Sequence, residues 1–577
     1  MTVALLASPG ADSPLRMWEC VALLLAMAVA FVIPSRYQCF FELLESLFKR
    51  LARRRVLSLL AIAAAAVLLR LALHSLLGTP QPGIHDEFSY LLAADTFAHG
   101  RLTNPPHPYW DLFESFHILQ QPTYASMYPP AQGLFMAAGI LLAGHPWAGV
   151  LLSMSLLCSA LLWMLRGWLP PEWALLGASL AILRLALFSY WANSYWGGAP
   201  AAIGGALVAG SLPRILRRRQ AVDAALFGFG LILLASSRPY EGFLFSIPFV
   251  ISLFVWLSRG DGLREKLVRI VLPACTILLV GAAALAYYDW RITGHPFVTP
   301  QLLNAQQYAT GGLMIWSKAP PPPIFHDGTM RDFYLFKTAA LADVPHSLGQ
   351  ALESVERKGL VVAYFFLGPL FLVPLILTPS VIWAAPARLL VFSMLSVGLG
   401  LACLGWLIFP HYFGPATCSL YALVVLSLMG LWKWKWRSRP TGRFLVRGIV
   451  AVAILMVVLR ISADRLGIDL ASVPFDWSAT APGDSERAAL AASLSAAPER
   501  FLVIVRYGAD HDANREWVYN EADINHAKIV WARDRGPETD ALVRYFHDRR
   551  AVVVEPDVDG LVTVPYRIAT DAHAPVP

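Results

Sequence analysis

Two adjacent carboxylates, Asp86 and Glu87, are the residues of this chain whose type and position most suggest chemistry. They closely follow a long apolar segment, residues 56–77, and they open a stretch that we expect to form a helix at the membrane surface. Acidic side chains at the mouth of a membrane span are costly unless they form an ion pair, bind a ligand or take part in a reaction. We therefore place the candidate active site in this loop.

The two carboxylates cannot share one role, because adjacent residues on a helix point about 100° apart. One can act as a base while the other orients it or faces a different partner. A simpler reading of Asp86 is helix capping, since Asp is a favoured residue at a helix N-terminus. The sequence leaves both roles of Asp86 open, and it predicts that Asp95, further along the helix, lies at the surface.

Composition then shows what must position these side chains. The chain has 577 residues, of which 57% are hydrophobic and 15% charged, and its mean hydropathy is +0.54. Many apolar stretches approach the length of roughly 20 residues that a membrane-spanning helix needs, and we count about twelve such crossings. The predicted fold class is therefore an all-α polytopic membrane protein.

The net charge of +7 comes from clusters of Lys and Arg in short connections between apolar segments. This placement is typical of cytoplasmic loops and does not indicate nucleic-acid binding. With these clusters in the cytoplasm, the loops 78–130 and 288–358 and the tail lie outside. The apolar run 131–143 is short for a span, so we expect it to be a re-entrant or juxtamembrane helix.

We divide the chain into three parts. Residues 1–55 hold an additional N-terminal transmembrane helix and a basic cytoplasmic segment, residues 56–461 form the transmembrane catalytic module, and residues 462–577 form a small extracytoplasmic domain. In that tail, apolar runs alternate with a helical stretch, which predicts an α/β unit with a parallel sheet. The tail contains no Gly-rich phosphate loop, so we expect it to pack or to dock the acceptor.

Two short turns on the outer side carry further candidates. Arg238 stands in a tight outer turn, against the usual bias toward cytoplasmic cations, and therefore needs a partner. That partner is either Glu241 or an anionic phosphate, which the planar fork of a guanidinium binds well. His411 could help to bind phosphate, although a lone His more often makes an ordinary hydrogen bond. The adjacent aromatics are Tyr240 and Tyr412.

A carboxylate, cations and aromatics at one membrane depth suit transfer of a sugar from a lipid-linked phosphate donor. The carboxylate would take a proton from the acceptor, and the cations would stabilise the departing phosphate. The two carboxylates with His85 could hold a divalent metal. No spacing resembles a dedicated ligand set, so we predict no obligatory metal or other cofactor.

Several of these residues together resemble a known family. The acidic pair Asp86-Glu87 after an early span, Tyr128 with two following prolines before the next helix, and His411-Tyr412 at the start of a late helix resemble the GT-C membrane glycosyltransferases. The likeness is to the protein O-mannosyltransferase and aminoarabinose transferase group, glycosyltransferase family 39. It covers residues 56–421, and the extra first helix, Arg238 in place of a common Lys, and the tail depart from it.

The resemblance implies a polyprenyl-phosphate sugar as donor, a protein, lipid or glycan as acceptor, and an inverting single displacement at the outer face. Asp86 would be the base, with Glu87 beside it. The implied substrate-binding residues are Arg238, Tyr240, Glu241, His411, Tyr412 and Tyr128. Composition favours a bacterial inner membrane, with the active site and tail toward the periplasm.

Two other functions remain open from the sequence. A lipid-linked glycan ligase would use the same groups but would need a wider outer cavity. A transporter or flippase would place charges at mid-membrane and repeat its broken helices in two halves. No such repeat is visible, although Arg70 and Arg184 do lie inside apolar runs.

Overall fold

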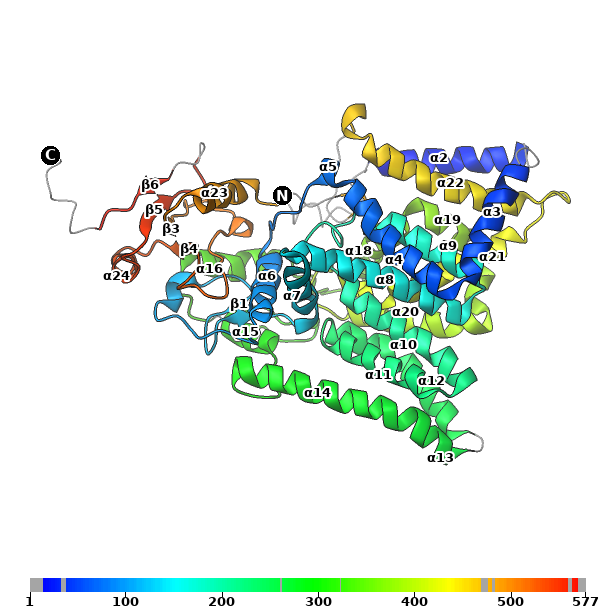
Figure 1. The fold of residues 1–577 in the computed structure, drawn as a ribbon, viewed down its shortest axis with the longest axis horizontal. Helices are drawn as coiled ribbons and strands as arrows, with labels where there is room; N and C mark the ends of the chain where they lie inside the picture. Colours follow the sequence, from blue (N-terminus) through cyan, green and yellow to red (C-terminus); the bar gives the residue numbers. More distant parts are fainter. Residues whose placement is uncertain are drawn as a thin grey trace.

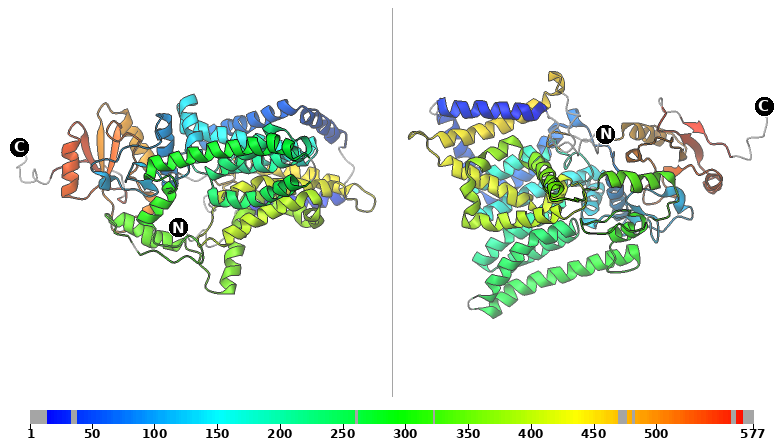
Figure 2. Two further views of the ribbon diagram at one scale, coloured as in Figure 1. Left: turned by 90° about the horizontal axis from the view of Figure 1, so that it is seen from below. Right: turned by 180° about the vertical axis from the view of Figure 1, so that it is seen from behind.

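A computed structural model describes residues 14–32, 38–259, 262–321, 323–468, 476–479, 483–558 and 563–568. Long helices lie side by side in a bundle, and the two outer loops and the tail gather at one end of it (Figures 1 and 2). Within the described residues, nine helices are long and apolar enough to cross a membrane, and three shorter apolar helices accompany them. The predicted helical membrane protein with a small α/β tail is confirmed, while the exact number of crossings stays a prediction.

The long candidate spans are α2 (Pro14–Val32), α4 (Arg55–Ala72), α8 (Pro146–Trp168), α10 (Ala199–Arg218), α12 (Pro239–Ser258), α13 to α14 (Leu263–Thr293), α18 to α19 (Leu348–Leu377), η7 to α21 (Pro410–Trp432) and α22 (Thr441–Ile461). The shorter apolar helices are α7 (Pro130–Ala143), α11 (Ala221–Ala235) and α20 (Ala385–Ala402), and α9 (Pro171–Ala181) continues into a π-helical turn, η2 (Ile182–Ala186). Several begin with a proline, which fits the first turn because its missing N–H would have no helical partner there.

The short helix α7 agrees with the prediction for residues 131–143. Its 14 residues rise only about 21 Å, less than the hydrocarbon thickness of about 30 Å. It packs between α8 and α6 (His85–Ala98), the helix that carries the acidic pair. A Cβ on Gly139 would lie 2.1 Å from the Gly149 nitrogen, so glycines allow α7 and α8 to touch through their backbones.

One basic segment differs from the prediction. We expected the basic cluster at residues 49–55 to be a plain connection, but most of it belongs to a helix, α3 (Gln38–Arg53). Leu43, Leu44 and Leu47 are exposed on this helix, whereas Lys49 and Arg50 follow directly after them. A helix with exposed leucines and a basic end is suited to lie along the headgroups.

The charges inside the apolar runs have partners within the fold. On η2, Arg184 lies 3.6 Å from the Glu19 carboxylate of α2 and donates to the carbonyl of Phe365. Arg70 on α4 donates to Asn193 and to the carbonyl of Gly78. Both guanidiniums therefore have structural roles, and the Glu19 pair ties the additional first helix into the bundle.

The tail contains the predicted parallel sheet. Its strands are β3 (Phe501–Val505), β4 (Ile529–Arg533), β5 (Arg550–Val554) and the short β6 (Val564–Pro565), in the order β4-β3-β5-β6. The first three pair in parallel, and β6 is antiparallel to β5. Helices α23 (Ser485–Ala496) and α24 (Pro537–Tyr545) complete the domain. Every residue of β3 is buried, as expected for a central strand covered on both faces.

A buried cation joins the tail to both outer loops. Arg533 on β4 pairs with Glu516 of the tail and lies 3.3 Å from Asp327 of the second loop. Its Nε donates to the carbonyl of Glu114 in the first loop. Asp95, expected at the surface, is instead half-buried and accepts a hydrogen bond from the backbone of Ala522 in the tail.

We predict that Arg533→Met loosens the tail. The substitution leaves the buried Glu516 without its cation, which costs about 3–5 kcal/mol. Hydrogen exchange of the detergent-solubilised protein should show faster exchange across β3 and β4. The matched control is Arg500→Met, because Arg500 is 36% exposed and pairs with the half-exposed Asp548, an interaction worth less than about 1 kcal/mol. Equal exchange in both variants would refute the role of Arg533.

Candidate functional site

Glu87 fixes the start of α6. Its carboxylate accepts three backbone hydrogen bonds, from Gly83 and Ile84 in the turn before the helix and from Tyr195 in the loop before α10. The side chain is only 3% exposed. Burial raises the pKa of Glu87 to about 7, although the amide donors oppose this rise. Glu87 therefore joins two loops and does not face the same groups as Asp86.

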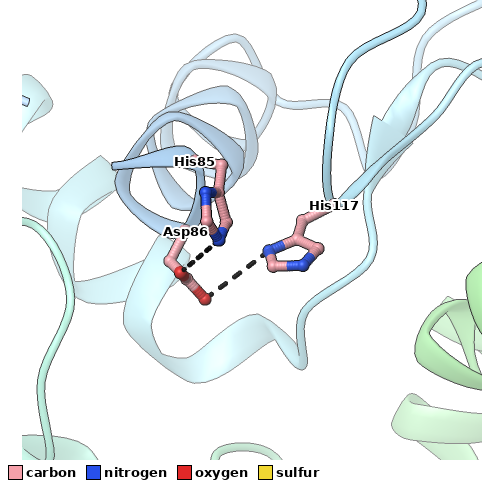
Figure 3. Close-up of side chains that lie close together, drawn as sticks. All are labelled: His85, Asp86 and His117. Carbon is pink, nitrogen blue, oxygen red and sulfur yellow. Dashed lines mark ion pairs between the residues drawn. The ribbon is translucent and has the colours of Figure 1, made fainter. Parts of the chain in front are cut away.

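Asp86 turns to the other side and lies among three polar side chains. The Nε2 atom of His85 is 3.3 Å from its carboxylate, and the Nδ1 atom of His117 is 3.6 Å away (Figure 3). The Tyr128 hydroxyl donates a hydrogen bond to the same carboxylate and also lies 2.9 Å from His117 Nδ1. We call His85, Asp86, His117 and Tyr128 the Asp86 cluster.

The electrostatics of the cluster keep Asp86 charged. Burial opposes its ionisation, but the neighbouring His85 and the hydrogen bonds from His117 and Tyr128 hold its pKa well below the usual range. Burial, together with His117, lowers the pKa of His85 to about 3. Burial and Asp86 raise the pKa of Tyr128 well above its ordinary value. At neutral pH the site thus holds a carboxylate, a neutral imidazole and a phenol that can donate.

The Asp86 cluster also contains side chains that could bind a metal ion. One ligand atom each from His85, Asp86 and His117 lies within 4.8 Å of the others. Imidazole nitrogen and carboxylate oxygen are common ligands of divalent transition metals, and they bind in the deprotonated forms found for His85 and Asp86. These residues could hold a divalent cation.

Aromatic rings from both outer loops close around the cluster. Phe333, at the start of the π-helical turn η4 (Phe333–Lys337) in the second loop, packs 4.8 Å from His85 and stacks 3.9 Å from Phe116. On another side, Tyr90 stacks on Tyr128 with ring centres 4.4 Å apart. The reacting groups of any substrate would therefore meet a wall that excludes water.

Arg238 is a cation that makes no direct ion pair with a carboxylate among the described residues. It is half-buried at the start of α12, and its guanidinium lies 4.6 Å from the centre of the Tyr412 ring. In the part of the chain that the structure describes, no ion pair joins it directly to an acid. Glu241, one of the two partners weighed from the sequence, is buried and interacts with Arg238 electrostatically. Burial raises the pKa of the Tyr90 phenol, Arg238 lowers it and Asp86 raises it further. Arg238 and Asp86 therefore both act electrostatically on Tyr90.

The remaining sequence candidates lie in different surroundings. His411 is buried, and its Nδ1 is 2.9 Å from the Tyr190 hydroxyl, while its ring lies 5.1 Å from that of Tyr412. The Tyr240 hydroxyl donates to the carbonyl of Gly400 on α20. His411 and Tyr412 thus border the Arg238 region, whereas the Tyr240 hydroxyl is engaged by another helix.

Sequence reasoning missed His117. It lies in the loop after α6, far along the chain from Asp86, and its backbone has φ of 61°, which a residue with a side chain rarely adopts. The Ser89 hydroxyl holds this backbone by donating to the His117 carbonyl. No spacing in the sequence announces such a contact, because it depends on how the loop folds back.

Protein-family models give no match to this chain, and curated proteins give none either. Among solved structures, it is similar to ArnT from Cupriavidus metallidurans in the apo state, at 14% identity and a TM-score of 0.47, over 87% of this chain and 93% of that one. The chain is likewise similar to ArnT from Cupriavidus metallidurans bound to undecaprenyl phosphate, at 14% identity and a TM-score of 0.46, over 87% of this chain and 92% of that one.

The chain is also similar to the Archaeoglobus fulgidus oligosaccharyltransferase in the apo form, at 12% identity and a TM-score of 0.42, over 78% of this chain. It spans 62% of the length of that protein. At such identities, the function must come from the site itself.

We predict that Glu87→Gln destabilises the protein. The glutamine would turn an NH₂ group toward backbone N–H donors, leaving buried donors unpaired at a cost of about 1–3 kcal/mol. Thermal unfolding in detergent should show a lower Tm for this variant. The control is Glu265→Gln, because Glu265 is 42% exposed and pairs only with surface arginines. An unchanged Tm for Glu87→Gln would show that the three amide contacts do not hold α6.

Proposed function

We propose that this protein is an integral-membrane glycosyltransferase of the GT-C type. It transfers a sugar from a polyprenyl-phosphate donor to a protein, lipid or glycan acceptor at the outer face of a bacterial inner membrane. One observation carries the proposal: Tyr128, which donates to Asp86, stacks on Tyr90, and both Asp86 and Arg238 act electrostatically on Tyr90. A base and an anion-binding cation beside each other are what such a transfer needs.

In the proposed mechanism, Asp86 takes the proton from the acceptor hydroxyl while that oxygen forms the new bond to the anomeric carbon. The bond from this carbon to the phosphate oxygen breaks at the same time, and its electron pair leaves with the phosphate. Since attack comes from the face opposite the leaving group, the configuration inverts. The low pKa makes Asp86 a weak base, so the proton moves late, when bond formation has made the acceptor oxygen acidic.

Arg238 serves the other end of the reaction. Its guanidinium would pair with the donor phosphate and stabilise the negative charge that grows as the phosphate leaves. Tyr412 limits the positions of this guanidinium by lying against it, and His411 borders the same region. Apolar side chains of the spans would hold the prenyl chain within the bilayer.

The residues around Asp86 orient its carboxylate. Tyr128 donates to it, and the two histidines lie on either side of the carboxylate. A divalent cation, if bound, would be held by His85, Asp86 and His117 and would supply Lewis-acid charge stabilisation. Tyr128 and the two histidines would also shield the Asp86 carboxylate from bulk water.

We expect Asp86→Asn to lower the transfer rate by about 10²–10⁴-fold, the range that general-base catalysis contributes. Purified protein would be assayed with a panel of synthetic polyprenyl-phosphate sugars, with EDTA or with added Mn²⁺. Asn keeps the shape of Asp, so the Tm should not change. Near-wild-type transfer by Asp86→Asn would refute the assignment of the base, and a rate that falls with EDTA and recovers with Mn²⁺ would show that the metal site is used.

Arg238→Gln should raise the donor KM by roughly tenfold or more, because a hydrogen bond to a charged group contributes about 1.5–3 kcal/mol. Arg238→Lys should recover part of the loss, since Lys keeps the charge but not the fork. The control is Arg291→Gln, an exposed arginine near the outer end of α14 that lies 5.9 Å from the Tyr287 ring. Equal donor KM values for Arg238→Gln and this control would contradict phosphate binding by Arg238.

A further inference from the structure

A cavity lies away from the Asp86 cluster, between the tail and the second outer loop. Its volume is about 530 Å³, and it lies at the carboxyl ends of β3 and β4. Small-molecule sites in proteins typically measure about 300–1,000 Å³. In sheets with parallel strands, ligands bind outside the carboxyl ends where the strand order reverses. Here β3 has β4 on one side and β5 on the other, so the chain reverses at this edge.

His511 lines this cavity with an unsatisfied nitrogen. Its side chain is only 5% exposed, and Nδ1 lies 2.8 Å from the Asp557 carboxylate. The ring stacks 3.8 Å from that of Tyr507. The other nitrogen, Nε2, is buried and has no hydrogen-bond partner among the described residues. Since buried polar groups are nearly always paired, the unpaired Nε2 is the atom that a ligand reaching this side chain of the cavity wall would satisfy.

The charges on the cavity wall are already balanced in pairs. Arg506 pairs with Asp534 at 2.6 Å, and Arg533 lies 3.3 Å from Asp327. A wall with little net charge favours neither a phosphate, which needs excess cations, nor a divalent metal, which needs free carboxylates. It does present both donors and acceptors at close spacing. A neutral ligand with many hydroxyls uses both, because each hydroxyl donates one hydrogen bond and accepts others.

We infer that this cavity binds a saccharide. If the proposed glycosyltransferase function holds, on which this part of the assignment rests, the saccharide belongs to the acceptor. The acceptor would then be a glycan or a glycolipid headgroup, which reaches the Asp86 cluster with one hydroxyl while another of its sugars occupies the tail.

The cavity shares a structural element with the catalytic cluster. The short helix α16 (Gly328–Asp332) lines the cavity and continues directly into η4, whose first residue, Phe333, packs against His85. A saccharide bound to Asp332 and Thr329 would therefore hold the same segment that forms the wall of the Asp86 cluster. Binding in the tail thus supports the order of the active site as well as the position of the acceptor.

The test is glycan binding by the full-length protein in detergent, first on a glycan array and then by titration with the best glycan. His511→Ala should weaken binding by about tenfold, the effect of losing roughly 1.4 kcal/mol. Asp332→Asn should also weaken binding; it is a milder change because Asp332 is 48% exposed and Asn has the same shape. The matched control, His526→Ala, should bind like the wild type, since His526 is 80% exposed and pairs only with Asp523 among the described residues.

Absence of glycan binding by the folded wild-type protein would overturn the inference, and so would unchanged affinity in both cavity variants. Binding of inorganic phosphate in place of glycans would overturn the saccharide assignment. The assay needs no donor, so its result does not depend on whether transfer occurs. If glycans bind in a manner that depends on His511 but no donor supports transfer, the cavity assignment holds and the proposed function fails. If the protein transfers sugar but binds no glycan, only the cavity assignment fails.

Discussion

The hydrogen bonds of one buried carboxylate determine the geometry of the outer face. Glu87 accepts backbone N–H groups from the turn before α6 and from the loop before α10, so it sets both where α6 begins and how it meets the bundle. Because Asp86 is the neighbouring residue, the hydrogen bonds of Glu87 also fix the direction in which the Asp86 side chain points. The two acids thus divide the work: one fixes the backbone, and the other is free to face His85, His117 and Tyr128.

The site keeps opposite charges near each other without letting them neutralise. Asp86 and Arg238 both act on Tyr90, which stacks on Tyr128, yet no ion pair joins the two charges among the described residues. A protein selected only for stability would have little reason to keep a half-buried guanidinium without an acid. Charges kept apart in this way lower the stability of the fold, and they are typical of sites where a bound ligand pairs with them.

The sequence was sufficient for features that depend on local patterns. Apolar runs located the helices of the bundle, and the run Phe501–Val505 located the central strand of the tail. It was insufficient where partners come from folding. The amides that hold Glu87 belong to the backbone and leave no mark on residue types, and His117 reaches Asp86 only through a loop with positive φ. Whether Arg238 pairs with Glu241 or is left for a phosphate could be judged only from side-chain positions.

The ion pair between Glu19 and Arg184 bears on biogenesis. Ribosomes make α2 long before η2, so Glu19 enters the bilayer when its cation does not yet exist. An acid without its cation is costly in a membrane helix, by up to about 3 kcal/mol at the helix centre and by less toward an end, where Glu19 lies. The first helix therefore gains its final stability only after a later helix has been inserted beside it, and its packing along α22 (Figure 1) follows after the last span. The helix α2 is thus synthesised before η2 and secured only after it.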